Sequence, residues 1–249
     1  MKRRCSFPYA RFVNTTSTVL PEHNKTTDLV CLAGLTSGLV CTLIAALAMP
    51  EAGRFWAYAT ILSRLLMYWG ASRKMGGRIF AELLAMGLIA GLIEVLADYY
   101  LIHWVTTGRL IYPPGDAILL DSPLWMPFAW TCVVVEFGYV GLRLARLGRQ
   151  PWLGAIVGGL LSGVAIGFYE YFAYQAGWWS YAPAKRMIGA HCSVYIPVGE
   201  AIMFTAFYPI FTRTQQIEDA TLRAIVRGAL FGATILVSYA VAHLMIEGQ

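Results

Sequence analysis

Residues 170–204 contain the stretch that decides the fold: Glu170-Tyr-Phe-Ala-Tyr-Gln-Ala-Gly177-Trp-Trp-Ser-Tyr181-Ala-Pro183, followed further on by Tyr195-Ile-Pro197-Val-Gly-Glu200-Ala-Ile-Met-Phe204. This order predicts an apolar helix that carries a carboxylate, then an aromatic loop. A second apolar helix, which begins near a proline and carries another carboxylate, is predicted to follow.

A weaker copy of the same plan lies earlier in the chain. Gly108-Arg-Leu-Ile-Tyr112-Pro-Pro114 corresponds to 177–183, and Trp125-Met-Pro127 takes the place of 195–197. We therefore expect a duplicated two-helix unit, with repeat copies at about 94–142 and 163–212. Any chemistry should lie where the two copies meet.

The composition places this unit in a membrane. The chain has 249 residues, of which 58% are hydrophobic and 13% are charged, whereas soluble domains carry about 25% charged residues. Apolar runs of about 20 residues recur, and each can cross a hydrocarbon core of about 30 Å as a helix. We expect an all-α, polytopic membrane helix bundle in which residues 1–28 form a cytoplasmic N-terminal tail and residues 29–249 form a single transmembrane bundle.

About seven transmembrane helices are expected. They are Leu29–Met49, Phe55–Gly70, Ile79–His103, Pro123–Leu142, Trp152–Ala176, Ser193–Thr212 and Ala224–Ile246. The second span is short and contains Arg64, so we expect it to tilt or to be partly buried. The fifth span contains five glycines with small-xxx-small spacing on two faces, and this spacing lets helix backbones approach closely in lipid: Gly154, Gly158, Gly159, Gly163 and Gly167. We therefore expect the fifth span near the centre of the bundle.

The basic residues indicate the orientation, because cytoplasmic loops carry an excess of lysine and arginine. With the N-terminus in the cytoplasm, the tail and the even-numbered loops hold most of the 19 basic residues: Lys2, Arg3, Arg4, Arg11, Lys25, Arg73, Lys74, Arg78, Arg143, Arg146, Arg149, Arg213, Arg223 and Arg227. The opposite side holds only Arg54, Arg109, Lys185 and Arg186. Both aromatic loops, 104–122 and 177–192, should then face outward. The expected location is a bacterial inner membrane, with no nucleic-acid partner.

Carboxylates inside the expected spans are the candidate catalytic groups. Ionisable residues there are costly and usually face the protein interior, and Arg64 can neutralise only one of them. For any single acid, hydrogen bonding between helices or an ion pair with Arg64 stays open as a purely structural role. For the group we favour a functional cavity. The candidate catalytic residues are Glu200, Glu170, Asp98 and Glu94, of which the last two lie one helical turn apart.

The sequence offers no cofactor or metal site. Its four histidines lack the HxxxH and HxxHH spacing of membrane di-iron enzymes, and its five cysteines contain no CxxC. Asp116 and Asp121 in the first aromatic loop would be weak magnesium ligands, and there is no phosphate-binding motif. The chemistry expected is therefore acid–base chemistry beside aromatic rings, without a metal or a cofactor.

Aromatic residues surround the candidate acids along the chain. Trp125, Trp178 and Trp179 lie at span ends and are accounted for by an interfacial belt. Aromatic faces attract cations by about 0.5–2 kcal/mol each, so a buried acid ringed by them suits protonation of an isoprenoid alkene. The candidate substrate-binding residues are Tyr112, Trp130, Trp179, Tyr181, Tyr174 and Phe204.

The segment from Glu170 to Phe204 resembles the repeated unit of small integral-membrane lycopene cyclases. That unit runs acidic residue, Gly-x-Trp-x-Tyr/Phe, Gly, then Pro-x-Glu-Glu and a Phe-rich helix. The first copy, from Gly108 to Trp130, looks more like the related carotenoid hydratases of the bacterioruberin pathway. The resemblance covers residues 94–212 and implies this fold and an apolar isoprenoid ligand. The Glu-Glu pair is Gly199-Glu200 in one copy and Ala129-Trp130 in the other, so only one of the family's glutamates is present.

Three functions stay open on the sequence alone. The first is a cofactor-free cyclase, hydratase or isomerase of carotenoid or terpenoid metabolism, in which Glu200 protonates a polyene and Glu170 or Asp98 acts as base or holds water. The second is a non-catalytic membrane subunit that binds pigment or lipid, as a homo-oligomer or within a larger complex. The third is a small transporter that uses the acids as a proton relay. The first two take a long isoprenoid or lipid from the bilayer.

The orientation can be tested with reporter fusions. A reporter fused after Gln249 should be external, and one inserted at Arg146 should be cytoplasmic, because the basic loops are retained inside. A cytoplasmic C-terminus would mean that one span is miscounted, and the short segment 55–70 is then the first to re-examine.

Overall fold

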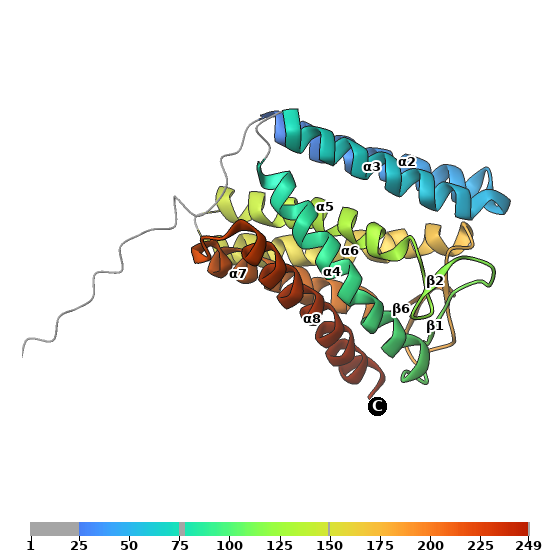
Figure 1. The fold of residues 1–249 in the computed structure, drawn as a ribbon. Coiled ribbons are helices and arrows are strands. Elements are labelled where there is room, and N and C mark those ends of the chain that lie inside the picture. Colours follow the sequence, from blue (N-terminus) through green and yellow to red (C-terminus); the bar gives the residue numbers. More distant parts are fainter. Residues whose placement is uncertain (1–24, 75–77, 149, 249) are drawn as a thin grey trace, which may run out of the picture.

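The computed structural model describes residues 25–74, 78–148 and 150–248, and these residues are mostly helical (Figure 1). The tail at 1–28 predicted from the sequence therefore lies almost entirely outside the described residues. The α-helices are α2 (Lys25–Leu47), α3 (Gly53–Lys74), α4 (Arg78–His103), α5 (Met126–Leu147), α6 (Pro151–Gln175), α7 (Tyr195–Arg213) and α8 (Ala220–Glu247). Each helix falls on one of the seven expected spans. Short 3-10 turns at Pro50–Ala52 (η1) and Thr214–Gln216 (η2) precede α3 and α8.

Five of the helices are long and apolar enough to cross a membrane: α2, α4, α5, α6 and α8. This result is compatible with a multi-pass integral membrane protein. Helix α3 falls outside the group and carries Arg54, Arg64, Arg73 and Lys74. Helix α7 falls outside it as well, and with 19 residues it is the shortest of the seven described helices.

Helices α4 to α8 pack in a closed ring, in which each helix contacts the next and α8 returns to α4. Phenylalanines from α7 and α8 fill part of the ring: Phe204, Phe207 and Phe211 stack along α7, and Phe231 packs against the first two. Helices α2 and α3 lie side by side as a separate hairpin, and Figure 1 shows this hairpin along one flank of the ring. The hairpin meets the ring through α4, α5 and α6.

The two aromatic loops contain short strands that the sequence analysis did not predict. The first loop holds β1 (Leu110–Ile111), β2 (Ile118–Leu119) and β3 (Ser122–Pro123), and the second holds β4 (Ser180–Tyr181), β5 (Met187–Ile188) and β6 (Cys192–Ser193). The order helix, three strands, helix therefore occurs twice along the chain. Strand β1 pairs antiparallel with β4, so the two loops lie together at one end of the bundle.

The glycines of α6 allow it to pack closely against both of its neighbours in the ring, but the expectation that this helix lies at the centre of the bundle is wrong. One face of α6, which carries Leu153, Leu160 and Phe168, is exposed, and α4 and α5 are more deeply buried. Gly154 and Gly158 face α5, while Gly159 and Gly163 face α7. A Cβ atom added at Gly163 would lie 2.5 Å from the carbonyl oxygen of Pro197. Because glycine has no side chain, Gly163 allows the short distance between α6 and α7.

We expect Gly163→Leu to lower the melting temperature of the protein in detergent, because a bulky side chain would push α6 away from α7. Overpacking of this kind costs about 1–3 kcal/mol. The matched control is Gly70→Leu, since a Cβ at Gly70 meets nothing within 4 Å. Equal melting temperatures for the two variants would contradict the close packing of α6.

Candidate functional site

A cavity of about 320 Å³ lies inside the described part of the chain, and all seven helices and both aromatic loops contribute to its wall. Its volume is at the lower end of the range for small-molecule sites, which is roughly 300–1,000 Å³. Apolar and aromatic side chains form most of the lining, among them Leu35, Ile61, Val133, Phe137, Ile166 and Phe172. The polar groups within this wall are few, and most are ionisable.

All four candidate catalytic acids line this one cavity. Glu94 and Asp98 reach it from α4, Glu170 from α6 and Glu200 from α7. They are between 1% and 4% exposed, although they are separated by up to about a hundred residues in the sequence. The fold therefore gathers the acids that the sequence analysis singled out.

The loops and α8 supply hydrogen-bond donors to these acids. Asp98 accepts from the Tyr112 hydroxyl and from the Ser122 hydroxyl, both at 2.7 Å. Glu170 accepts from the indole nitrogen of Trp179 at 2.6 Å and also interacts with Tyr181. The two copies of the repeat thus contact their acids in the same way, because the tyrosines that interact with Asp98 and Glu170 occupy corresponding positions in the two loops.

The other two acids keep free oxygen atoms. Glu200 Oε1 accepts from the Tyr239 hydroxyl of α8 at 2.7 Å, and Glu94 interacts with Asp98 and the Trp130 indole. Within the described residues, Oε2 of Glu94 and Oε2 of Glu200 are buried and lack a hydrogen-bond partner. A buried oxygen without a hydrogen-bond partner costs free energy. A ligand or a water molecule that donates a hydrogen bond to either atom would recover that cost.

The loop tyrosines act as donors at neutral pH. Burial, together with the nearby Asp98 carboxylate, raises the pKa of the Tyr112 phenol well above its ordinary value. Burial and the nearby Glu170 carboxylate raise the pKa of Tyr181 in the same way. Both phenols therefore keep their protons and can hold a carboxylate in a fixed orientation.

The structure corrects one alternative, the pairing of Arg64 with Glu94 or Asp98. Arg64 instead forms an ion pair with Glu136 at 3.1 Å, and Glu136 also accepts from the Tyr68 hydroxyl at 2.8 Å. The reason is the rotation of α3, which turns Arg64 toward α5 and not toward α4. The Arg64–Glu136 pair lines the same cavity as the four acids.

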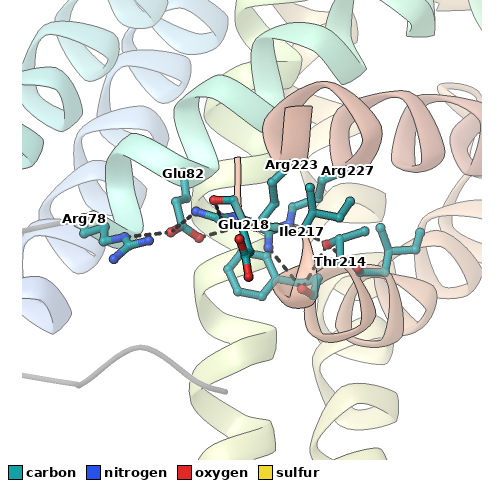
Figure 2. Close-up of polar contacts among 9 residues, drawn as sticks. Arg78, Glu82, Thr214, Ile217, Glu218, Arg223 and Arg227 are labelled. Carbon is teal, nitrogen blue, oxygen red and sulfur yellow. Dashed lines mark hydrogen bonds and ion pairs between the residues drawn. The ribbon is translucent and has the colours of Figure 1, made fainter. Parts of the chain in front are cut away.

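Glu82, the remaining acid within a span, is engaged elsewhere. Figure 2 shows it among three arginines; Arg78 and Arg227 each lie 3.0 Å from it, and Arg223 lies at 3.6 Å. Arg227 also donates to the Phe211 carbonyl oxygen and to the Thr214 hydroxyl, so this cluster joins α4 to the turn between α7 and α8. Within the described residues, no lysine or arginine therefore pairs with any of the four cavity acids.

Four of the candidate substrate-binding residues line the cavity: Tyr112, Trp130, Trp179 and Tyr181. Tyr174 and Phe204 do not. Tyr174 is 42% exposed on the outer face of α6, while Phe204 is buried against Phe137 and Phe231. The sequence analysis grouped Tyr174 and Phe204 with the other four because they lie near the candidate acids along the chain. The side to which each residue points on its helix takes both away from the cavity.

The assignment of three tryptophans to an interfacial belt was wrong. Trp125 and Trp178 are 4% and 3% exposed and, with Trp179, line the cavity in mutual ring contact. Their indole nitrogens have defined acceptors: Trp125 donates to Asp116 at 2.9 Å, and Trp178 donates to the Gly53 carbonyl oxygen at 2.7 Å. Asp116 and Asp121 bind Trp125 and His103 respectively.

Tyr239 is a site residue that the sequence analysis did not single out. Tyr239 is the sole tyrosine of α8, and a polar residue in an apolar span is the signal that could have identified it. The C-terminal part of α8 also holds the loops in place. His243 contacts the Thr107 carbonyl oxygen at 3.2 Å, and the buried Glu247 carboxylate accepts from the Lys185 backbone at 2.8 Å.

The fold and the cavity together define a class: a helical protein with five helices suited to cross a membrane and a buried site of four acids within an aromatic wall. A family model described as a domain of unknown function (DUF6989) matches residues 95–246, more than half of the chain, so the chain belongs to that family. The match extends from α4 into α8 and contains Asp98, Glu170 and Glu200. The search of curated proteins and the search of solved structures each found no match.

The ion pair and the cavity acids should respond differently to neutralisation. Glu136→Gln leaves the Arg64 charge buried without a partner, and breaking a buried pair in this way costs about 3–5 kcal/mol. Glu200→Gln keeps the Tyr239 hydrogen bond and strands no charge, so its cost should be much smaller. Thermal unfolding of both variants in one detergent measures the difference; a Glu200→Gln protein as unstable as Glu136→Gln would contradict it.

Proposed function

We propose that the chain is a membrane-embedded, cofactor-free enzyme of isoprenoid metabolism that works by acid–base catalysis. One observation carries the proposal: four buried acids without a basic partner among the described residues share one cavity with aromatic rings. A packed interior does not need such a group, because buried ionisable residues are costly. Functional sites are where they are retained.

The proposed reaction begins with proton transfer. Glu200 donates its proton to one carbon of an alkene, and the neighbouring carbon becomes a carbocation. The faces of Trp125, Trp130 and Trp179 stabilise that cation. Loss of a proton to the Glu170 or Asp98 carboxylate then gives an isomerised alkene, or a cyclised one when a second double bond of the polyene has first attacked the cation. Attack by a water molecule held by one of these carboxylates, which takes the proton that the water loses, gives an alcohol. Return of the proton from this acid to Glu200 completes the cycle. Cyclase, isomerase and hydratase chemistry thus use the same groups.

The proposed setting is a bacterial inner membrane, with seven spans and a cytoplasmic N-terminus. The distribution of basic residues supports this orientation, and it puts the paired aromatic loops on the outer side. The resemblance to lycopene cyclases and bacterioruberin-type hydratases supports an isoprenoid substrate. The cavity wall includes Leu39 and Phe168, which are 51% and 69% exposed on α2 and α6, so we infer that a long substrate reaches the site from the lipid between these helices.

Glu200→Gln tests the proposal most directly. The substitution keeps the shape of the side chain and the hydrogen bond from Tyr239 but removes the transferable proton. Turnover of an isoprenoid polyene by the purified protein, followed by chromatography and mass spectrometry, should fall by about 10²–10⁴-fold, and Glu170→Gln should impair it as well. Glu218→Gln, at an exposed carboxyl outside the cavity, is the matched control and should retain full activity.

Two results would contradict an enzymatic role. A loss below about tenfold in Glu200→Gln is too small for a general acid. A polyene that co-purifies with the unmodified protein and is recovered unchanged after incubation would identify a binding subunit. Lipids extracted from the purified protein and analysed by mass spectrometry would name the ligand in either case.

A further inference from the structure

The cavity has a second polar region, away from the four acids. Arg64 and Glu136 line it from α3 and α5. On α5, Glu136 lies six residues beyond Trp130, the residue that interacts with Glu94, and six residues correspond to about 9 Å of helix rise. The ion pair therefore lies further from the loop end of α5 than the residue that contacts the acids.

The ion pair leaves one strong donor unused. Arg64 Nε donates to the Thr60 carbonyl oxygen at 3.3 Å, and Nη1 bonds both carboxylate oxygens of Glu136. The Nη2 atom bonds to none of the described residues, although the Arg64 side chain is only 8% exposed. A guanidinium normally uses its donors in pairs, so a buried guanidinium with a free Nη2 in a cavity wall is suited to hold an acceptor oxygen.

Thr60 adds an independent observation at the same place. Its side chain lines the cavity one turn before Arg64, is 1% exposed, and its hydroxyl lacks a partner within the described residues. Other helical threonines donate to the carbonyl oxygen four residues earlier: Thr42, Thr131, Thr205 and Thr234. Thr60 departs from this local pattern, so its hydroxyl is also available to a ligand.

Charge balance indicates which oxygen would fit. Glu136 already neutralises Arg64, and the four acids add no positive charge to the cavity. An anionic group placed beside Arg64 would meet the Glu136 carboxylate and would have to be desolvated. A neutral carbonyl or hydroxyl oxygen accepts a hydrogen bond from Nη2 without either cost.

We propose that the substrate is an isoprenoid that already carries a neutral oxygen, a carbonyl or a hydroxyl, and that Arg64 and Thr60 bind this oxygen while the four acids face the hydrocarbon part. The inference rests on the proposed use of the cavity for an isoprenoid. It implies that a reaction which introduces oxygen into the isoprenoid precedes this step. By holding this oxygen, Arg64 and Thr60 determine which double bond of the polyene lies beside Glu200.

The test compares three probes that share one polyene skeleton: retinal (aldehyde), retinoic acid (carboxylate) and axerophthene (hydrocarbon). Binding to the full-length protein in detergent is measured by quenching of tryptophan fluorescence, since tryptophans line the cavity. Retinal should bind roughly tenfold or more tightly than axerophthene, because a hydrogen bond to a charged donor is worth that factor or more. Retinoic acid should bind more weakly than retinal.

Two variants locate the source of the preference. Thr60→Val keeps the shape and removes the hydroxyl, so it should reduce the ratio of retinal to axerophthene affinity severalfold. The double variant Arg64→Met with Glu136→Leu replaces the pair by apolar groups, which strands no charge, and should bring the ratio close to one. Thr131→Val, at a buried threonine that does not line the cavity, is the matched control and should leave the ratio unchanged.

The outcomes separate this inference from the proposed function. Equal binding of retinal and axerophthene by the unmodified protein, a ratio unchanged in Thr60→Val and the double variant, or a preference for retinoic acid would overturn the role of Arg64 and Thr60. Each of these results would leave an isoprenoid cavity in place. Failure of all three probes to bind would instead contradict the isoprenoid cavity itself. Should the double variant not fold, Thr60→Val alone decides.

Discussion

Neutralisation of charge within the helices is the constraint on which the rest of the structure depends. Water is not available there to solvate an ion, so every charged group needs a partner. Arg64 engages Glu136, and Arg78, Arg223 and Arg227 surround Glu82. Of the four remaining acids, Asp98, Glu170 and Glu200 accept hydrogen bonds from the aromatic loops and from α8. Glu94 interacts with Asp98 and with the Trp130 indole of α5.

This dependence explains why the loops are structured. Strand β1 pairs with β4, and the Tyr195 hydroxyl donates to the Gly108 carbonyl oxygen at 2.7 Å, so each loop is held by the other copy of the repeat. Tyr112 and Trp179 can then bind Asp98 and Glu170 in a fixed geometry. A loop that moved freely would leave these acids without partners inside the bundle.

The sequence allowed prediction of the helices and of the acids that meet, because both follow from one-dimensional signals. A long apolar run has one stable backbone solution in lipid, and a carboxylate within such a run must face inward. The partner of Arg64 could not be predicted, since it depends on how α3 is rotated against a helix 72 residues away in sequence. The tryptophans were misassigned for a related reason: their position at span ends indicates depth in a membrane, and only the folded loops bury Trp125 and Trp178.

The closed ring of helices has a consequence for how the protein is made. Helix α8 is synthesised after the other six helices, yet it closes the ring between α4 and α7. It also supplies Tyr239 to Glu200 and Glu247 to the second loop. A nascent chain in which only α2 to α7 have packed together therefore has an incomplete ring, in which Glu200 lacks its phenol partner. The cavity around the acids is complete only when the last of these helices docks, so a chain arrested before α8 would lack the enclosed site.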